Sequence, residues 1–131
     1  MTEDFQPQIF EFFAQKLEAK FPGVKLSSVI TDQPPSFPCV QIEQDDLPTD
    51  HDNSGRIRFV NVRLRVRVYT TGNTKTSQAR KIQMCIDEIA NSLNFTRQSY
   101  ITSGYLYQNS AYQTETTYRA RMTEDGVLTR T

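Results

Sequence analysis

The sequence contains no run of 18 or more apolar residues, so it predicts no membrane-spanning helix. It has no excess of charge of either sign, because 15 Lys and Arg residues balance 15 Asp and Glu residues. A net charge of zero removes the usual electrostatic argument for a protein that binds nucleic acid or a membrane surface. Residues 1–4 are acidic and lack the basic start of a signal peptide, so we expect the protein to be made in a cytoplasm and kept there.

Residue types and motifs that are common in catalytic, metal-binding or phosphate-binding sites are also scarce. Cys39 and Cys85 lie in different predicted elements, form no CxxC pair, and are expected to be free thiols. The one histidine, His51, lies in a polar segment where nothing in the sequence fixes it against a nucleophile. The five glycines are isolated from one another, so no GxGxxG or P-loop motif exists to cradle a phosphate. We therefore expect a protein that is not an enzyme and that needs neither a cofactor nor a resident metal.

A group of acidic residues leaves one chemical alternative open. Its members are Glu43, Asp45, Asp46, Asp50 and Asp52. The pattern of a calcium-binding loop is absent, and no lysine occurs between Lys25 and Lys75 to complete a nuclease-like site. A small metal-dependent nuclease remains the alternative. The main expectation is a long solvated loop over 44–55 that orders on contact with a partner protein.

A chain of 131 residues fits one domain spanning 1–131. In the long segment 57–69, valines and a leucine alternate with polar residues, which predicts a half-buried strand of an antiparallel or mixed sheet. The complete set of expected elements is a helix over 3–21, strands within 24–70, a helix over 75–93, strands within 95–122 and a polar tail over 123–131. Together they predict an α+β fold, a two-layer sandwich with two helices on one face of a mixed, mostly antiparallel sheet of four to five strands.

Arginines gather on the predicted outward face of this sheet. Arg63, Arg65 and Arg67 alternate along the long strand, and Arg119 and Arg121 alternate along the last one. The face could be solvated, could contact an acidic partner, or could form a nucleic-acid groove. Zero net charge and the lack of interleaved aromatic residues disfavour the groove. Because Glu115 is the only acid expected on the outward face of the last strand, we expect a neighbouring subunit or partner to supply further carboxylates.

The charges are balanced in total but segregated along the chain. Residues 43–52 carry five acids and no Lys or Arg, whereas residues 56–67 carry five arginines and no acid. A subunit with one acidic and one basic surface can associate head to tail, and such contacts close into rings when the rotation allows. The apolar residues of the first helix cover an arc of about 200°, more than one core contact needs. Phe5 and Phe12 are therefore candidate interface residues, and so is Met84, which lies opposite the apolar stripe of the second helix.

Five short segments, taken in order, resemble one family. They are FPCVQI at 37–42, VRVY at 66–69, a helix beginning ARKI at 79 with LNFTR at 93–97 after it, and YRAR at 118–121. The same order of an FPCV strand, a long strand, a helix, a GFTR-like strand and a closing strand is found in small tail proteins of long-tailed phages. Over roughly 35–122 the chain is similar to the tail terminator, or tail-completion, proteins. It departs from that pattern at Asn94, where many relatives have glycine, and in the Tyr- and Gln-rich stretch 105–112.

This resemblance implies an α+β subunit that forms a homohexameric ring. Such a ring would cap the last ring of tail-tube subunits, stop tube growth and offer a docking surface to the head connector or neck protein. The further implied partners are the sheath protein, if the tail is contractile, and DNA that passes through the ring without specific binding. The implied location is the head-proximal end of the tail in a virion or tail-like particle. The runner-up is a head–tail joining protein on the connector side.

Overall fold

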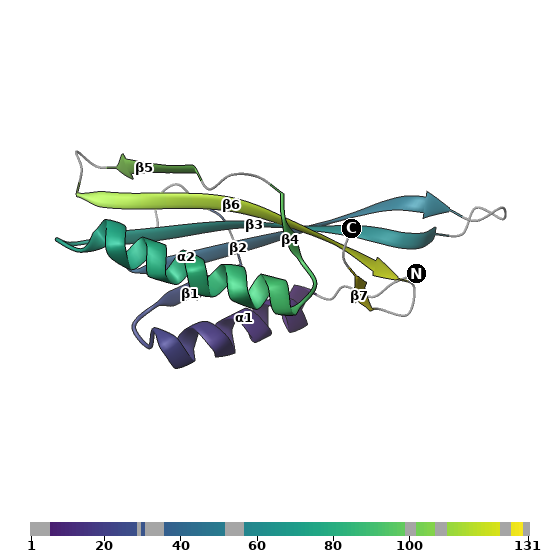
Figure 1. The fold of residues 1–131 in the computed structure, drawn as a ribbon, viewed down its shortest axis with the longest axis horizontal. Coiled ribbons are helices and arrows are strands. Elements are labelled where there is room, and N and C mark those ends of the chain that lie inside the picture. The colour runs from purple at the N-terminus through teal and green to yellow at the C-terminus, as the bar shows by residue number, and fades with distance from the viewer. Residues whose placement is uncertain are drawn as a thin grey trace.

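The computed structural model describes residues 6–28, 30, 36–51, 57–98, 102–106, 110–123 and 127–129. Two helices and seven strands follow one another along the chain (Figure 1). The elements are α1 (Gln6–Lys20), β1 (Lys25–Ser27), β2 (Cys39–His51), β3 (Ile57–Thr71), α2 (Lys75–Ser92), β4 (Thr96–Arg97), β5 (Thr102–Leu106), β6 (Ala111–Thr123) and β7 (Leu128–Thr129). Neither described helix is long and apolar enough to cross a membrane.

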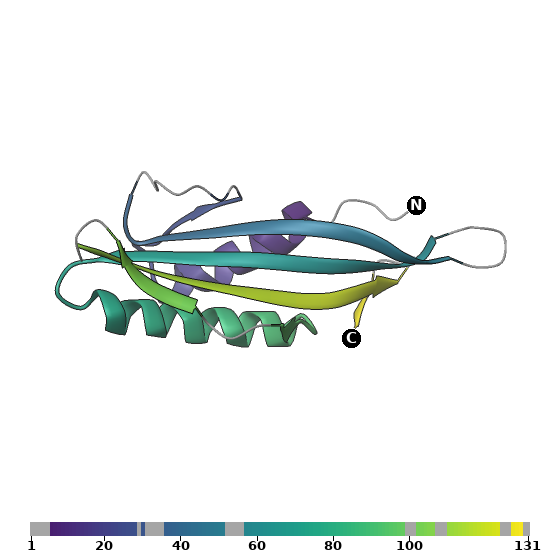
Figure 2. The same ribbon diagram turned by 90° about the horizontal axis from the view of Figure 1, so that it is seen from above.

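All seven strands belong to one mixed sheet. Its main order is β1-β2-β3-β6-β4, and β5 and β7 pair with other stretches of β6. The β1–β2 pair is parallel, and every other pair is antiparallel. Both helices lie on the same face of the sheet (Figures 1 and 2). The two-layer α+β fold expected from the sequence is therefore confirmed.

The core lies between this sheet and the helices. From β3 it takes Val62, Leu64, Val66 and Val68, which are all fully buried and alternate as their spacing predicts. From the helices it takes the apolar stripe of α2 and one row of α1, and these residues are Ala79, Ile82, Cys85, Ile86, Ile89, Ile9, Phe13 and Leu17. The polar residues of β3 consequently point away from the helices.

The expectation of an acidic loop over 44–55 is wrong for the residues that the structure describes. β2 continues to His51 and pairs with β3, with Glu43 opposite Arg65 and Asp45 opposite Arg63. Residues 52–55 lie outside the described part of the chain. A run of Asp and a proline has low strand propensity, but the long partner strand supplies main-chain hydrogen bonds that override it. The pairing becomes irregular only near the tip, between Pro48 and His51.

Two smaller corrections concern the number of strands and the C-terminal segment. The described sheet has seven strands instead of four to five, because β5, β4 and β7 cover the outer edge of β6 one after another. β4 and β7 have only two residues each, too few for any alternation to be visible. β7 also shows that 123–131 is not simply a polar tail, since Leu128 pairs with Met122 and packs against the core.

Candidate interaction surfaces

The outer face of the sheet, which is the face turned away from the helices, carries a ladder of ion pairs. Arg63 Nη2 lies 2.8 Å from Asp45 Oδ2, and Arg65 Nη2 lies 3.0 Å from Glu43 Oε1. Arg67 Nε donates to Glu115 Oε1 at 2.6 Å, and its side chain is only 16% exposed. The expectation that these three arginines are incompletely neutralised within one subunit is therefore wrong. The hairpin brings the acidic segment alongside the basic one, so that Asp45 and Glu43 neutralise Arg63 and Arg65, while Glu115 of β6 neutralises Arg67.

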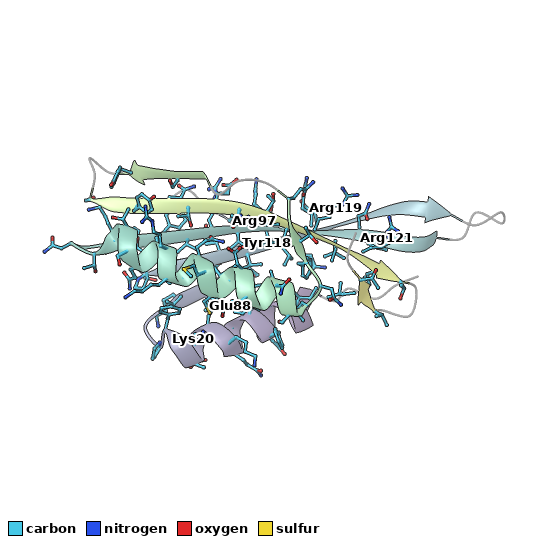
Figure 3. All side chains as sticks on the ribbon, in the orientation of Figure 1. Lys20, Glu88, Arg97, Tyr118, Arg119 and Arg121 are labelled. Carbon is cyan, nitrogen blue, oxygen red and sulfur yellow. The ribbon has the colours of Figure 1, made fainter. Side chains whose placement is uncertain are left out.

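β6 adds Arg119 and Arg121 to this face (Figure 3). Arg119 lies directly opposite Arg63 in the β3–β6 register, and Arg121 lies opposite Asn61. Like charges directly opposite each other in a sheet repel. Arg119 therefore faces a like charge across the strands, and this stretch of β6 lies on the opposite side of β3 from Glu43 and Asp45 of β2.

Replacing Arg119 with glutamate is expected to stabilise the isolated subunit by about 0.2–1 kcal/mol. The substitution exchanges a repulsive cross-strand pair with Arg63 for an attractive one. Urea unfolding of the purified chain measures the difference, and Arg119→Gln serves as the control because it removes the charge without reversing it. A clear loss of stability in Arg119→Glu would mean that this guanidinium is held by another group within the subunit.

The other residues predicted to form interfaces are spread over the molecule. Phe12 is half-buried on α1, whereas Met84 on α2 is 64% exposed. Both belong to the helical layer, so they do not join the arginines of the outer face. Asp46 and Asp50 are strand positions of β2, opposite Val62 and Phe59. Phe5 and Asp52 lie outside the described residues.

Phe12 lines a shallow hollow between the two helices. The hollow has a volume of about 350 Å³, and its apolar floor includes Cys85 and Ile89. Lys20 and Glu88 close one side with an ion pair of 3.5 Å between two well-exposed side chains (Figure 3). Exposed pairs of this kind add about 0–1 kcal/mol, so the hollow is not held rigidly shut.

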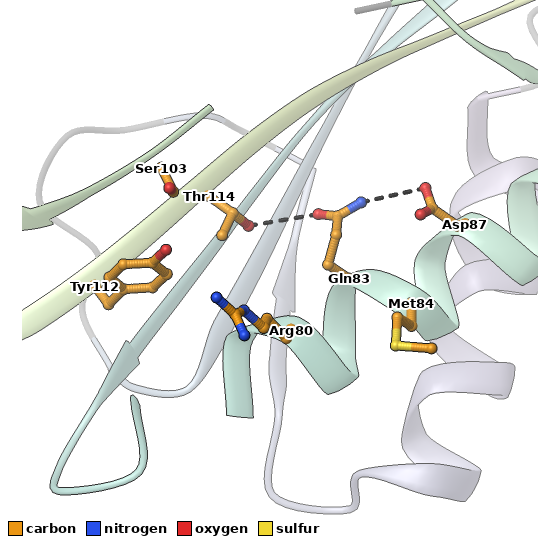
Figure 4. A pocket seen from close by; sticks show the side chains of 7 residues that line it. All are labelled: Arg80, Gln83, Met84, Asp87, Ser103, Tyr112 and Thr114. Carbon is orange, nitrogen blue, oxygen red and sulfur yellow. Dashed lines mark hydrogen bonds between the residues drawn. The ribbon is translucent and has the colours of Figure 1, made fainter. Parts of the chain in front are cut away.

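Met84 lines a second hollow, between α2 and the strands β5 and β6, again of about 350 Å³ (Figure 4). The residues around it are Arg80, Gln83, Met84, Asp87, Ser103, Tyr112 and Thr114. Met84 and Tyr112 supply apolar surface, Arg80 is an exposed cation, and Ser103 belongs to the edge strand β5. This combination of a helix wall, an edge strand and a few polar groups is typical of grooves that accept an extended segment.

A buried polar network forms the floor of this second hollow. Gln83, which is 2% exposed, donates from Nε2 to the Tyr118 hydroxyl at 2.7 Å and to Asp87 Oδ1 at 3.4 Å. Its Oε1 accepts from the Thr114 and Thr116 hydroxyls at 3.4 and 3.3 Å. One glutamine side chain thus satisfies polar groups from three positions of β6. The network fixes how α2 lies along β6.

Tyr118 donates its hydroxyl proton to Asp87, which also accepts from Arg97 Nη1 at 3.3 Å. Burial, together with the neighbouring Asp87 carboxylate, raises the pKa of Tyr118 far above its ordinary value. The phenol therefore stays protonated at neutral pH and acts as a hydrogen-bond donor. Burial also raises the pKa of both Cys39 and Cys85, so both thiols stay protonated and poorly nucleophilic.

The sequence did not single out Gln83, Asp87 or Tyr118. A usable signal was present, because Gln83 follows Ala79 by four residues and so shares the apolar face of the helix. A polar side chain on a core face indicates a buried partner.

Among the described residues, no group of three or more His, Cys, Asp or Glu side chains is placed to hold a metal ion. In comparisons with known proteins, no family model matches the chain, and no curated protein matches it.

Proposed function

We propose that this protein is the tail terminator of a long-tailed phage or a tail-like particle. In this role it is a non-enzymatic subunit of a homohexameric ring. The ring caps the tail tube, stops its growth and presents a surface to which the head connector docks. The main support is that the five short segments described above resemble segments of that family and occur in the same order along the chain.

The positions of these segments in the fold support the proposal. The FPCV segment leads into β2, VRVY lies in β3, and YRAR lies in β6. These are the three consecutive central strands of the sheet, so the resemblance covers one connected unit. The α+β architecture is also the one that the resemblance implies. The three ion pairs of the outer face are compatible with a structural role, because they leave fewer free cations to attract nucleic acid nonspecifically.

Deleting the gene and imaging the lysate by electron microscopy tests this function. Loss of a terminator is expected to give overlong tail tubes and heads without tails, and a plasmid copy of the wild-type gene is expected to restore normal length. Tails of normal length that are not joined to heads would instead identify a head–tail joining protein. Divalent-dependent cleavage of DNA by the purified chain would overturn the structural role.

A further inference from the structure

The sheet has an open strand edge at each margin. On one side of the sheet, the edge of β2 that faces away from β3 is covered by β1 only over residues 39–41. From residue 42 onward, no strand of the described structure pairs with this edge. On the other side, β5 pairs with β6, and within the described ranges no strand lies along its outer edge. Figure 2 shows β2 and β5 at opposite margins. Open edges present main-chain donors and acceptors that can pair with another strand.

The two edges carry charged side chains of opposite sign, although each carboxylate on β2 is paired with an arginine of β3. On β2, the open stretch bears Glu43 and Asp45, whose side chains remain 39% and 43% exposed despite their ion pairs. Beside β5 stand two cations, Arg80 at the hollow and Lys75, whose Nζ lies 5.8 Å from the centre of the Tyr105 ring. The carboxylate of the same hollow, Asp87, is already engaged by Arg97 and Tyr118. The edge at β5 therefore favours an acidic strand.

The β5 edge also offers apolar surface that an added strand would cover. Tyr105 is 55% exposed and packs edge-on against Tyr112, with 5.2 Å between the ring centres. Met84, 64% exposed, continues this surface along the hollow of about 350 Å³. A strand added at an edge places alternate side chains over such a hollow, which combines main-chain hydrogen bonds with apolar burial.

We propose that the open edge of β2 in one copy adds to the edge of β5 in the next copy, so that the sheet continues across a head-to-tail contact. The lengths agree, because β5 has five residues and β2 is regular from residue 42 until the irregularity after Pro48. Since the two edges differ, the contact is heterologous and closes into a ring when its rotation allows. This inference rests on the proposed ring function and names the surfaces that build the ring.

The β5 side is tested with Arg80→Glu, which places a carboxylate where the acidic edge of β2 would arrive. Sedimentation velocity over a concentration series is expected to show a subunit dissociation constant raised about 100-fold, the size of effect that a close like-charge contact produces. Lys81→Glu is the matched control. It is the neighbouring exposed cation of α2, makes the same change of charge, and does not line the hollow.

The β2 side is tested with two neighbouring proline variants, Gln44→Pro and Asp45→Pro. In an antiparallel edge strand, successive residues direct their main-chain groups alternately toward the partner strand and toward the open edge. One variant therefore disturbs the β2–β3 pairing and lowers the unfolding midpoint, whereas the other blocks only the open edge. The variant that keeps the wild-type midpoint is expected to be monomeric. If neither folds, the Arg80→Glu and Lys81→Glu pair still decides the question.

Mixing the two blocked variants tests the head-to-tail geometry directly. Each retains the edge that the other has lost, so an equimolar mixture is expected to give a discrete species of twice the 15.1 kDa subunit mass and nothing larger. A dimer formed by Arg80→Glu alone would mean that β2 pairs with β2 of another copy, which overturns the inference.

The remaining outcomes separate this inference from the proposed function. A ring that persists in Arg80→Glu and in the folded proline variant overturns the edge contact, while the terminator role stays supported by overlong tubes in the deletion lysate. A wild-type chain that remains monomeric at its highest soluble concentration also overturns the edge contact. Normal tails in the deletion lysate would refute the terminator role, whatever the sedimentation results show.

Discussion

Replacing Gln83 with alanine is expected to lower the free energy of unfolding by about 3 kcal/mol and the melting temperature by on the order of 10 °C. The glutamine is 2% exposed, and its amide bonds to Tyr118, Asp87, Thr114 and Thr116. Removing it leaves two buried threonine hydroxyls without their acceptor. Each buried polar group that loses its partner costs about 1–3 kcal/mol.

The measurement is chemical unfolding followed by circular dichroism. Gln83→Met keeps most of the side-chain volume, so a comparison with Gln83→Ala separates the lost hydrogen bonds from the cavity. Lys81→Ala changes an exposed position on the same helix and is expected to stay within about 0.5 kcal/mol of the wild type. If Gln83→Met were as stable as the wild type, the network would not be what holds α2 on β6.

The bounds of the elements with a clear hydrophobic periodicity were predicted to within two residues. The second helix was expected over 75–93 and is Lys75–Ser92, and the long strand was expected over 57–69 and is Ile57–Thr71. In both, one face is apolar over many residues, and burial of that face decides the conformation. The weakly patterned strands β4, β5 and β7 depend on β6 as a partner, and the residues that form them carry no such signal on their own.

The ion pairs between β2 and β3 were not predicted, although the sequence contains the information for them. The acidic segment in β2 and the basic segment in β3 pair with each other in an antiparallel arrangement. This places Asp45 against Arg63 and Glu43 against Arg65, an arrangement that can be read from the sequence once a hairpin is assumed. The expected loop over 44–55 pairs with no strand, so it could not predict these ion pairs. The Gln83 network could not be derived in this way, since it depends on how α2 crosses β6.

Shortening the β2–β3 hairpin is expected to abolish tail completion while leaving the subunit folded. The variant joins Pro48 to Val60, which lie opposite each other in the register, through an Asn-Gly turn in place of residues 49–59. The hairpin extends beyond both helices (Figure 1). β6 pairs with β3 as far as Phe59, so only β2 and β3 remain at the tip beyond that residue. Two strands alone are marginally stable in water, and such a tip favours a contact with another protein.

Because Val60 and the buried residues after it are retained, the free energy of unfolding is expected to change by no more than about 1 kcal/mol. In a complementation assay, the shortened chain is expected to reduce the yield of infectious particles on the order of 100-fold, as loss of a docking contact worth about 2.7 kcal/mol would. A variant of full length, Asp50→Ala with Asp52→Ala, separates the length of the arm from its charge. If the shortened chain yielded particles with joined tails of normal length, the arm would have no part in either capping or docking.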